Sequence, residues 1–147
     1  MTQIDIAIVG AGLFGRKHVE TMQQEPGCRL VAIADPGPEA AAYARELGVP
    51  CFEDYRAMLD RVRPQAAIIA APNVLHAAVG IACAERGIHM LVEKPIADTV
   101  EAALQLAEAA ERAGVALLVG HHRRHNPIIE QAREVVQSGR IGRVTAI

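Results

Sequence analysis

The stretch Ile4-Asp5-Ile6-Ala7-Ile8-Val9-Gly10-Ala11-Gly12-Leu13-Phe14-Gly15 is an apolar run followed by glycines at the G-x-G-x-x-G spacing. The run has the length and branched composition of a buried strand, and a helical pattern of apolar residues starts at Leu13. In this context Gly10 permits a tight turn, Gly12 permits close approach of a pyrophosphate, and Gly15 permits packing of helix on strand. The pattern therefore predicts a phosphate-binding turn at a helix N-terminus.

Short apolar runs rich in Ile and Val alternate with segments of helical period along the rest of the chain. The runs predicted to be strands are residues 4–9, 30–34, 66–71, 88–92 and 115–119. The segments predicted to be helices are residues 13–24, 38–47, 55–61, 75–86, 99–113 and 128–138. Strands that are apolar on both faces need helices above and below a parallel sheet, so the predicted fold class is α/β, a doubly wound parallel sheet.

Boundary signals agree with these elements. Glycines follow four of the helical segments, as C′ glycines do: Gly48, Gly87, Gly114 and Gly139. Asp98 with Glu101 three residues later predicts a capping box. We assign residues 1–125 to one dinucleotide-binding domain, and residues 126–147 to a connecting helix and the start of a strand over 144–147. A chain that stops within a strand indicates a piece of a longer protein, because the strand lacks backbone partners.

Composition excludes several classes of partner. The 15 Lys and Arg residues against 17 Asp and Glu residues give a net charge of −2, and aromatic residues make up 3% of the chain. Nucleic acid is not expected, because binding it needs a basic stripe and usually stacking rings. No apolar run approaches the roughly 18 residues that cross a bilayer, and the N-terminus lacks a basic region, so we expect a cytoplasmic protein without membrane contact. Cys28, Cys51 and Cys83 show no C-x-x-C spacing and are expected to be reduced thiols.

A carboxylate follows the second predicted strand. Asp35 lies about 20 residues after Gly15, where a carboxylate accepts hydrogen bonds from the adenosine ribose of a dinucleotide. Its charge would repel a 2′-phosphate, and Pro36 stands where an arginine would otherwise accept one, so NAD is favoured and NADP is less expected. The alternative is that Asp35 only caps the turn before Gly37 and Pro38.

Polar segments also follow the third, fourth and fifth predicted strands. They are Ala71-Pro72-Asn73-Val74-Leu75-His76, Glu93-Lys94-Pro95 and residues 121–127. Ligands of open α/β sheets bind outside the carboxyl ends of the strands, so these segments are candidate parts of one site. For Asn73 and His76 the alternative is structural, as a helix cap and as a polar residue of the first helical turn.

Lys94 is the most informative of these residues. Lys17 and Lys94 are the two lysines among 15 Lys and Arg residues, so a lysine here departs from the usage of the chain. A partly desolvated ammonium can lose its proton, which suits proton transfer or polarisation of a substrate hydroxyl. The alternative for Lys94 is a surface ion pair with Glu93.

The segment 121–127 is rich in imidazole and guanidinium groups. His121 and His125 are spaced like a metal pair, but no third ligand is close and arginines stand between them, so no metal site is predicted. Arg124, with Arg123 and His122, is instead a candidate for binding a hydroxylated or acidic substrate. The alternative is an exposed basic loop.

Together these residues resemble the glucose-fructose oxidoreductase, inositol dehydrogenase and rhizopine-catabolism (Gfo/Idh/MocA) family of NAD(P)-dependent oxidoreductases. The resemblance covers essentially the whole chain and rests on the glycine turn with His18, on Ala34-Asp35-Pro36, and on the three later segments with Gly120. It implies a Rossmann domain that binds NAD. The cofactor-binding residues expected are Gly10, Gly12, Leu13, Phe14, Gly15, Asp35, Ala71, Pro72, Asn73, His76, Glu93 and Lys94.

The resemblance also implies roles. Gly12, Leu13 and Phe14 would lie along the pyrophosphate, and Asn73 and Glu93 would face the nicotinamide half. Lys94 would reach the substrate hydroxyl as the catalytic residue, beside the substrate-binding residues His122 and Arg124. The bond between Lys94 and Pro95 is expected to be cis.

The activity implied is hydride transfer between NAD and a secondary alcohol of a sugar, cyclitol or similar polyol, in a protein that forms homo-oligomers at full length. Family members carry an Asp-x-x-x-His arrangement in a second α/β domain, and no aspartate of this chain has a histidine four residues later. That domain is therefore expected to be absent, and this chain alone to be inactive. His121 and His122 replace residues that are often aromatic or amide, which leaves the substrate open. The alternatives are a non-catalytic NAD-binding module and an S-adenosylmethionine-dependent methyltransferase.

Overall fold

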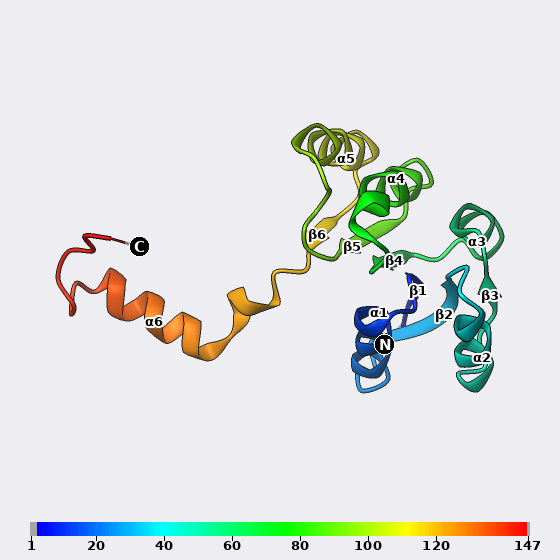
Figure 1. Ribbon diagram of the computed structural model, residues 1–147, viewed down its shortest axis with the longest axis horizontal. Helices are drawn as coiled ribbons and strands as arrows, with labels where there is room; N and C mark the ends of the chain where they lie inside the picture. The colour runs from blue at the N-terminus through cyan, green and yellow to red at the C-terminus, as the bar shows by residue number, and fades with distance from the viewer. Residues whose placement is uncertain (1–2, 147) are drawn as a thin grey trace.

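The computed structural model describes residues 3–146, which contain one six-stranded parallel sheet (Figure 1). The strands are β1 (Ile4–Val9), β2 (Cys28–Ala34), β3 (Cys51–Phe52), β4 (Ala66–Ile69), β5 (His89–Val92) and β6 (Leu117–Val119). Their order across the sheet is β3-β2-β1-β4-β5-β6, and every neighbouring pair is parallel. The chain thus runs outward on one side of β1 and then outward on the other, which confirms the predicted doubly wound α/β fold.

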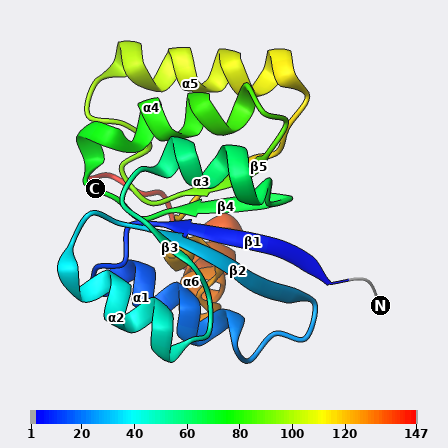
Figure 2. The same cartoon turned by 90° about the vertical axis from the view of Figure 1, so that its right-hand side faces the viewer.

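Helices cover both faces of the sheet. They are α1 (Leu13–Met22), α2 (Pro38–Glu46), α3 (Tyr55–Val62), α4 (Asn73–Ala84), α5 (Val100–Ala113) and α6 (Pro127–Gln137), with a 3₁₀ turn η1 (His122–His125) before α6. Figure 2 shows α3, α4 and α5 over one face and α1 and α2 over the other. The five predicted strands and six predicted helices are present, with ends shifted by no more than two residues.

The central strand shows why the sheet needs two layers of helices. Ala7 and Val9 of β1 belong to the core formed with α3, α4 and α5, whereas Ile8 packs with Val19 and Met22 of α1. Successive side chains of a strand point to opposite faces, so an uninterrupted apolar run is buried on both. Ala7 and Ile8 are both 0% exposed. The apolar run that begins the glycine motif therefore anchors it in the centre of the sheet.

Three details differ from the sequence prediction. Strand β3 was not predicted, because two residues are too short for a periodic signal; it forms through the pairings Ile33 with Cys51 and Ala34 with Phe52. The predicted capping box is wrong as well. Thr99, not Asp98, is the cap of α5, and its hydroxyl oxygen accepts a hydrogen bond from the Ala102 N–H at 3.1 Å.

The third difference concerns the end of the chain. Residues 144–146 form no strand, because no strand of residues 3–146 lies beside them to supply backbone partners, and Ile147 is outside the described residues. Helix α6 lies apart from the sheet, beyond β6 (Figure 1), and none of its residues is buried. The division of the chain at residue 125 stays a prediction.

Candidate active site

The carboxyl end of β1 turns into α1 through a backbone that only glycine permits at two positions. Gly10 has a φ of +96°, and a Cβ there would lie 2.6 Å from backbone atoms of Ala70. A Cβ on Gly15 would overlap the carbonyl oxygen of Gly10, so α1 starts in direct contact with the end of β1. A Cβ on Gly12, in contrast, would meet no described atom within 4 Å. Gly12 therefore borders open space in front of the helix.

The start of α1 offers hydrogen-bond donors to that space. Gly12 is the N-cap of the helix and, having no side chain, makes no side-chain cap hydrogen bond with the described residues. The first N–H groups of a helix lack partners within the helix, and the helix dipole adds a partial positive charge. Unobstructed donors beside an open Gly12 fit the phosphates of a dinucleotide.

Asp35 joins two loops at this edge of the sheet. Its Oδ2 atom accepts a hydrogen bond from the Ala11 N–H at 2.7 Å, and its Oδ1 atom accepts one from the Gly37 N–H at 2.7 Å. Asp35 therefore does cap this turn, as the structural alternative predicts. Each carboxylate oxygen has a second lone pair, so the contacts orient Asp35 without using all its capacity to accept hydrogen bonds.

A hollow of about 310 Å³ brings several predicted cofactor residues together. Gly10, Asp35, Ala71 and Pro72 line it, together with apolar side chains such as Leu75. Its lining is mostly apolar and includes the two carboxylates of Asp35 and Glu53, which suits a flat, weakly polar ring attached to a sugar.

Asn73 and His76 both belong to the first turn of α4, but they differ in exposure. Asn73 is exposed, and Pro72 rather than Asn73 is the N-cap, without a side-chain cap bond among the described residues. His76 is 1% exposed, and its ring nitrogens lie 2.7 Å from the Pro95 carbonyl oxygen and 2.8 Å from the Ala71 carbonyl oxygen. The ring presents no nitrogen to a cofactor here, so His76 is placed as a link between two loops and is not retained as a direct ligand.

Glu93 follows β5 and is held by a residue that the sequence analysis did not count as part of the site. Its Oε1 atom lies 2.8 Å from Nε2 of His18 on α1, and its Oε2 atom accepts a hydrogen bond from the Lys94 N–H at 3.2 Å. A Cβ at Gly120 would lie 3.0 Å from Oε1 of Glu93, so this carboxylate also meets the loop after β6. The signal for His18 was its place in the motif, one helical turn after Gly15.

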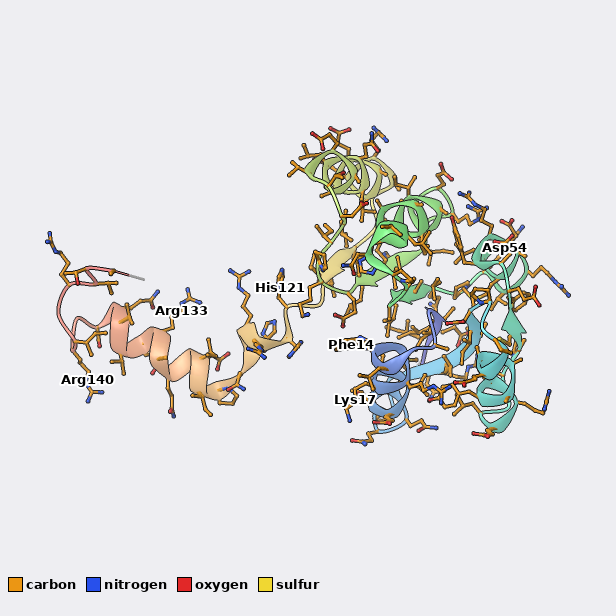
Figure 3. All side chains as sticks on the ribbon, in the orientation of Figure 1. Phe14, Lys17, Asp54, His121, Arg133 and Arg140 are labelled. Atoms are coloured by element: carbon orange, nitrogen blue, oxygen red, sulfur yellow. The ribbon has the colours of Figure 1, made fainter. Side chains whose placement is uncertain are left out.

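Lys94 lies between the glycine turn and the loop after β6. Its Nζ atom is 5.8 Å from the centre of the Phe14 ring, and residues 3–146 contain no ion pair between Nζ and Glu93, so the surface-pair alternative is wrong. The bond between Lys94 and Pro95 is cis, as predicted. In Figure 3, Phe14 projects from α1 on the side of the molecule where His121 lies.

A second, larger hollow of about 520 Å³ joins Lys94 to the predicted substrate residues. It is lined by Lys94, Gly120, His121, His122, Arg123, Arg124 and Ile129. No carboxylate belongs to this lining, so a ligand there meets cations and imidazoles. The structure therefore brings His122 and Arg124 to the same hollow as Lys94.

Two kinds of site were also sought in the described part of the chain. No group of three or more His, Cys, Asp or Glu side chains within residues 3–146 has the geometry to hold a metal ion. No helix of that part is long and apolar enough to span a membrane.

The fold and the glycine turn together define a Rossmann dinucleotide-binding domain. The family model GFO_IDH_MocA, described as "Oxidoreductase family, NAD-binding Rossmann fold", matches residues 4–121. The chain belongs to this Gfo/Idh/MocA family and corresponds to its NAD-binding domain. The membership also removes the methyltransferase alternative.

Curated and solved relatives are similar over nearly the whole chain. Inositol 2-dehydrogenase 2 of Saccharopolyspora erythraea is 35% identical over 144 residues, which are 95% of this chain and 42% of that protein. The scyllo-inositol dehydrogenase of Lactobacillus casei, solved with NAD(H) and scyllo-inositol, superposes with a TM-score of 0.90 at 28% identity, covering 98% of this chain and 44% of that one. The WlbA dehydrogenase of Bordetella pertussis, solved with NADH and UDP-GlcNAcA, gives a TM-score of 0.91 at 30% identity, covering 97% of this chain and 42% of that one.

The chain spans about two-fifths of the length of the relatives it matches.

Proposed function

We propose that this chain is the cofactor-binding part of an NAD-dependent dehydrogenase that transfers a hydride between nicotinamide and a secondary alcohol of a sugar, cyclitol or similar polyol. The observation that carries the proposal is the position of Lys94. Its Nζ atom lies 5.8 Å from the Phe14 ring of the glycine turn, and its side chain also lines the hollow that contains His122 and Arg124. One ammonium is therefore shared by a cofactor turn and a candidate substrate hollow.

The cofactor would be held by residues at four strand ends. The open backbone at Gly12 with Leu13 and Phe14 suits the pyrophosphate, and Gly10 and Gly15 give that turn its shape. Asp35 suits the adenosine ribose, and Ala71 and Pro72 line the hollow beside it. Asn73 and Glu93 complete the set toward the nicotinamide half. The nicotinamide, when bound, supplies the hydride acceptor or donor.

Lys94 would act on the substrate hydroxyl. As a neutral amine, Lys94 would accept the proton of that hydroxyl as the hydride passes to the nicotinamide, and the resulting ammonium would donate a hydrogen bond to the carbonyl oxygen that forms. The His18 and Lys94 contacts to the Glu93 carboxylate fix the start of the loop that carries this lysine. His122 and Arg124 would orient the other hydroxyl groups through hydrogen bonds.

The substrate class is supported by the charge and size of the hollow and by the relatives. A lining of cations and imidazoles without a carboxylate suits a ligand rich in oxygen acceptors. Proteins similar to this chain are named inositol 2-dehydrogenase, scyllo-inositol 2-dehydrogenase (NAD(+)) and levoglucosan dehydrogenase.

Two measurements test the proposal. Calorimetric titration of the 147-residue chain with NAD, NADP and S-adenosylmethionine should show binding of NAD and none of S-adenosylmethionine.

The second measurement is turnover, followed by NADH absorbance over a panel of inositols and sugars. It uses the full natural protein in which this sequence occurs. Lys94→Met should lower kcat by about 100-fold or more. Lys17→Met, which removes the other lysine from an exposed pair with Glu20, should leave kcat unchanged. Failure to bind NAD, or full turnover in Lys94→Met, would overturn the proposal, and binding without turnover of any polyol would favour a non-catalytic module.

A further inference from the structure

A third hollow, of about 260 Å³, lies beside Asp35 where the glycine turn meets the start of α2. Its charged lining residues are Arg16, Asp35 and Glu39, and its remaining walls include Gly12 and Gly37. In dinucleotide-binding domains the carboxylate after the second strand faces the ribose 2′-hydroxyl, and an arginine nearby accommodates a 2′-phosphate. This hollow is therefore the space in which a 2′-phosphate would be accepted or rejected.

Arg16 is the cation that such a phosphate would need, and it is already engaged. Its Nε atom donates a hydrogen bond to the Ala11 carbonyl oxygen at 3.1 Å, and its guanidinium carbon lies 4.5 Å from the centre of the Tyr43 ring. Its NH2 atom lies 3.9 Å from Oε2 of Glu39. The first two contacts hold the guanidinium in place, and the third opposes its charge.

The charges around the hollow favour a neutral sugar edge. Arg16 contributes one positive charge, and Asp35 and Glu39 contribute two negative charges. Both oxygens of Asp35 already accept backbone hydrogen bonds, so this carboxylate is fixed in place. Glu39 is different, because its side chain is 91% exposed and, within residues 3–146, it pairs with Arg16 alone.

We infer that Glu39 is a specificity-determining residue that excludes NADP by opposing the charge of Arg16, so that Arg16 is a latent ligand for a 2′-phosphate. This inference rests on the proposed function of the chain as an NAD-binding domain. It adds a second carboxylate, on α2, to the discrimination that the sequence analysis gave to Asp35 alone. With Glu39 neutral, one positive and one negative charge remain, and the repulsion of a doubly charged phosphate falls.

The test compares dissociation constants of NAD and NADP for the unmodified chain and for Glu39→Gln. We expect NADP to bind roughly five-fold more tightly to Glu39→Gln, while NAD binding changes by less than about two-fold, because NAD carries no 2′-phosphate. The gain should shrink as salt is raised, because exposed charges are screened. Glu46→Gln is the matched control, since it removes a carboxylate from the last turn of the same helix, roughly 10 Å further along.

A second variant assigns the effect to Arg16. In the double variant Arg16→Gln with Glu39→Gln the gain in NADP affinity should disappear, which a double-mutant cycle detects as coupling between the two positions. Glu39→Lys should raise NADP affinity further than Glu39→Gln does. Equal NADP affinity in the unmodified chain, Glu39→Gln and Glu39→Lys would overturn the inference, as would an equal gain in Glu46→Gln. Absence of NAD binding by the unmodified chain would instead overturn the proposed function.

Discussion

Nδ1 of His76 lies 2.7 Å from the carbonyl oxygen of Pro95, and Nε2 of the same ring lies 2.8 Å from the carbonyl oxygen of Ala71. A single buried imidazole on α4 thus joins the loop after β4 to the loop after β5, directly after Lys94. Among the described residues, His76 is the one polar or charged residue that is buried. The spacing between the candidate cofactor loop and the candidate catalytic lysine therefore depends on this ring.

Replacing His76 should destabilise the domain. His76→Leu removes the imidazole that lies between the Pro95 and Ala71 carbonyl oxygens, so at least one of them loses a hydrogen-bond donor, and we expect the free energy of unfolding to fall by about 2–4 kcal/mol. Urea denaturation followed by circular dichroism measures this change. His125→Leu is the control, because His125 is exposed in η1 and its loss should cost less than about 0.5 kcal/mol. Equal stabilities of the two variants would contradict the linking role of His76.

Substitutions at two glycines of the turn should have different effects, one on stability and the other on NAD binding. Gly15→Ala drives a Cβ into the Gly10 carbonyl and should lower the free energy of unfolding by more than about 2 kcal/mol. Gly12→Ala meets no described atom and should change stability by less than about 1 kcal/mol. Its methyl group would still occupy the open space in front of α1, so NAD binding should weaken at least several-fold. A Gly12→Ala chain that binds NAD as tightly as the unmodified chain would show that the phosphates lie elsewhere.

Asp35 should matter for both binding and stability. In Asp35→Asn the neutral side-chain amide keeps one acceptor oxygen, so one of the two backbone N–H groups, on Ala11 or Gly37, loses its acceptor and the other keeps an uncharged one. We expect NAD binding to weaken several-fold and the free energy of unfolding to fall by about 1 kcal/mol. Calorimetry and urea denaturation on the same sample measure the two effects. Asp54→Asn, which retains an acceptor at the N-cap of α3, should leave NAD affinity unchanged. NAD affinity preserved in Asp35→Asn would remove this carboxylate from the ribose site.

Burial of Cys83 predicts a loss of stability at alkaline pH. Burial raises the pKa of this thiol from 9.0 to about 12, with a smaller opposing effect of Arg86. The unfolded chain therefore releases the proton first as pH rises, so the contribution is intact below pH 9.0 and is lost between pH 9.0 and about 12. Over this interval the free energy of unfolding should fall by about 1.4 kcal/mol per pH unit more in the unmodified chain than in Cys83→Ala. Cys28→Ala, which keeps Cys83, should retain the steep slope, and identical slopes in all three proteins would refute the prediction.

Much of the fold could be predicted because its signals are local. The apolar run over 4–9, the glycine spacing and the helical periods are set by side chains close together in sequence, and they placed the five longer strands and the helices within two residues. Strand β3 could not be found in this way. It consists of Cys51 and Phe52, and its only stabilisation as a strand in the described chain comes from pairing with β2, which is distant in sequence.

The sequence predicted where the candidate site lies, at the carboxyl ends of the strands. It did not predict the contacts between the side chains there. Periodicity put Asp35, Glu93 and Lys94 at one edge of the sheet, because parallel strands all end there. It could not show that His76 turns inward to two carbonyl oxygens while Asn73, three residues earlier, is exposed. Nor could it pair His18 with Glu93, since 75 residues separate them.

The sequence by itself determined the layered α/β architecture, the glycine turn after β1 and the family, because these depend on short-range order along the chain. Only the tertiary structure decided how charges and hydrogen bonds are shared between loops. Glu39 opposite Arg16, His18 against Glu93 and Lys94 beside Phe14 are contacts that cross from one element to another. Such contacts depend on distances in space, which are set when the helices pack against the sheet. The spacing of residues along the sequence does not reveal these contacts.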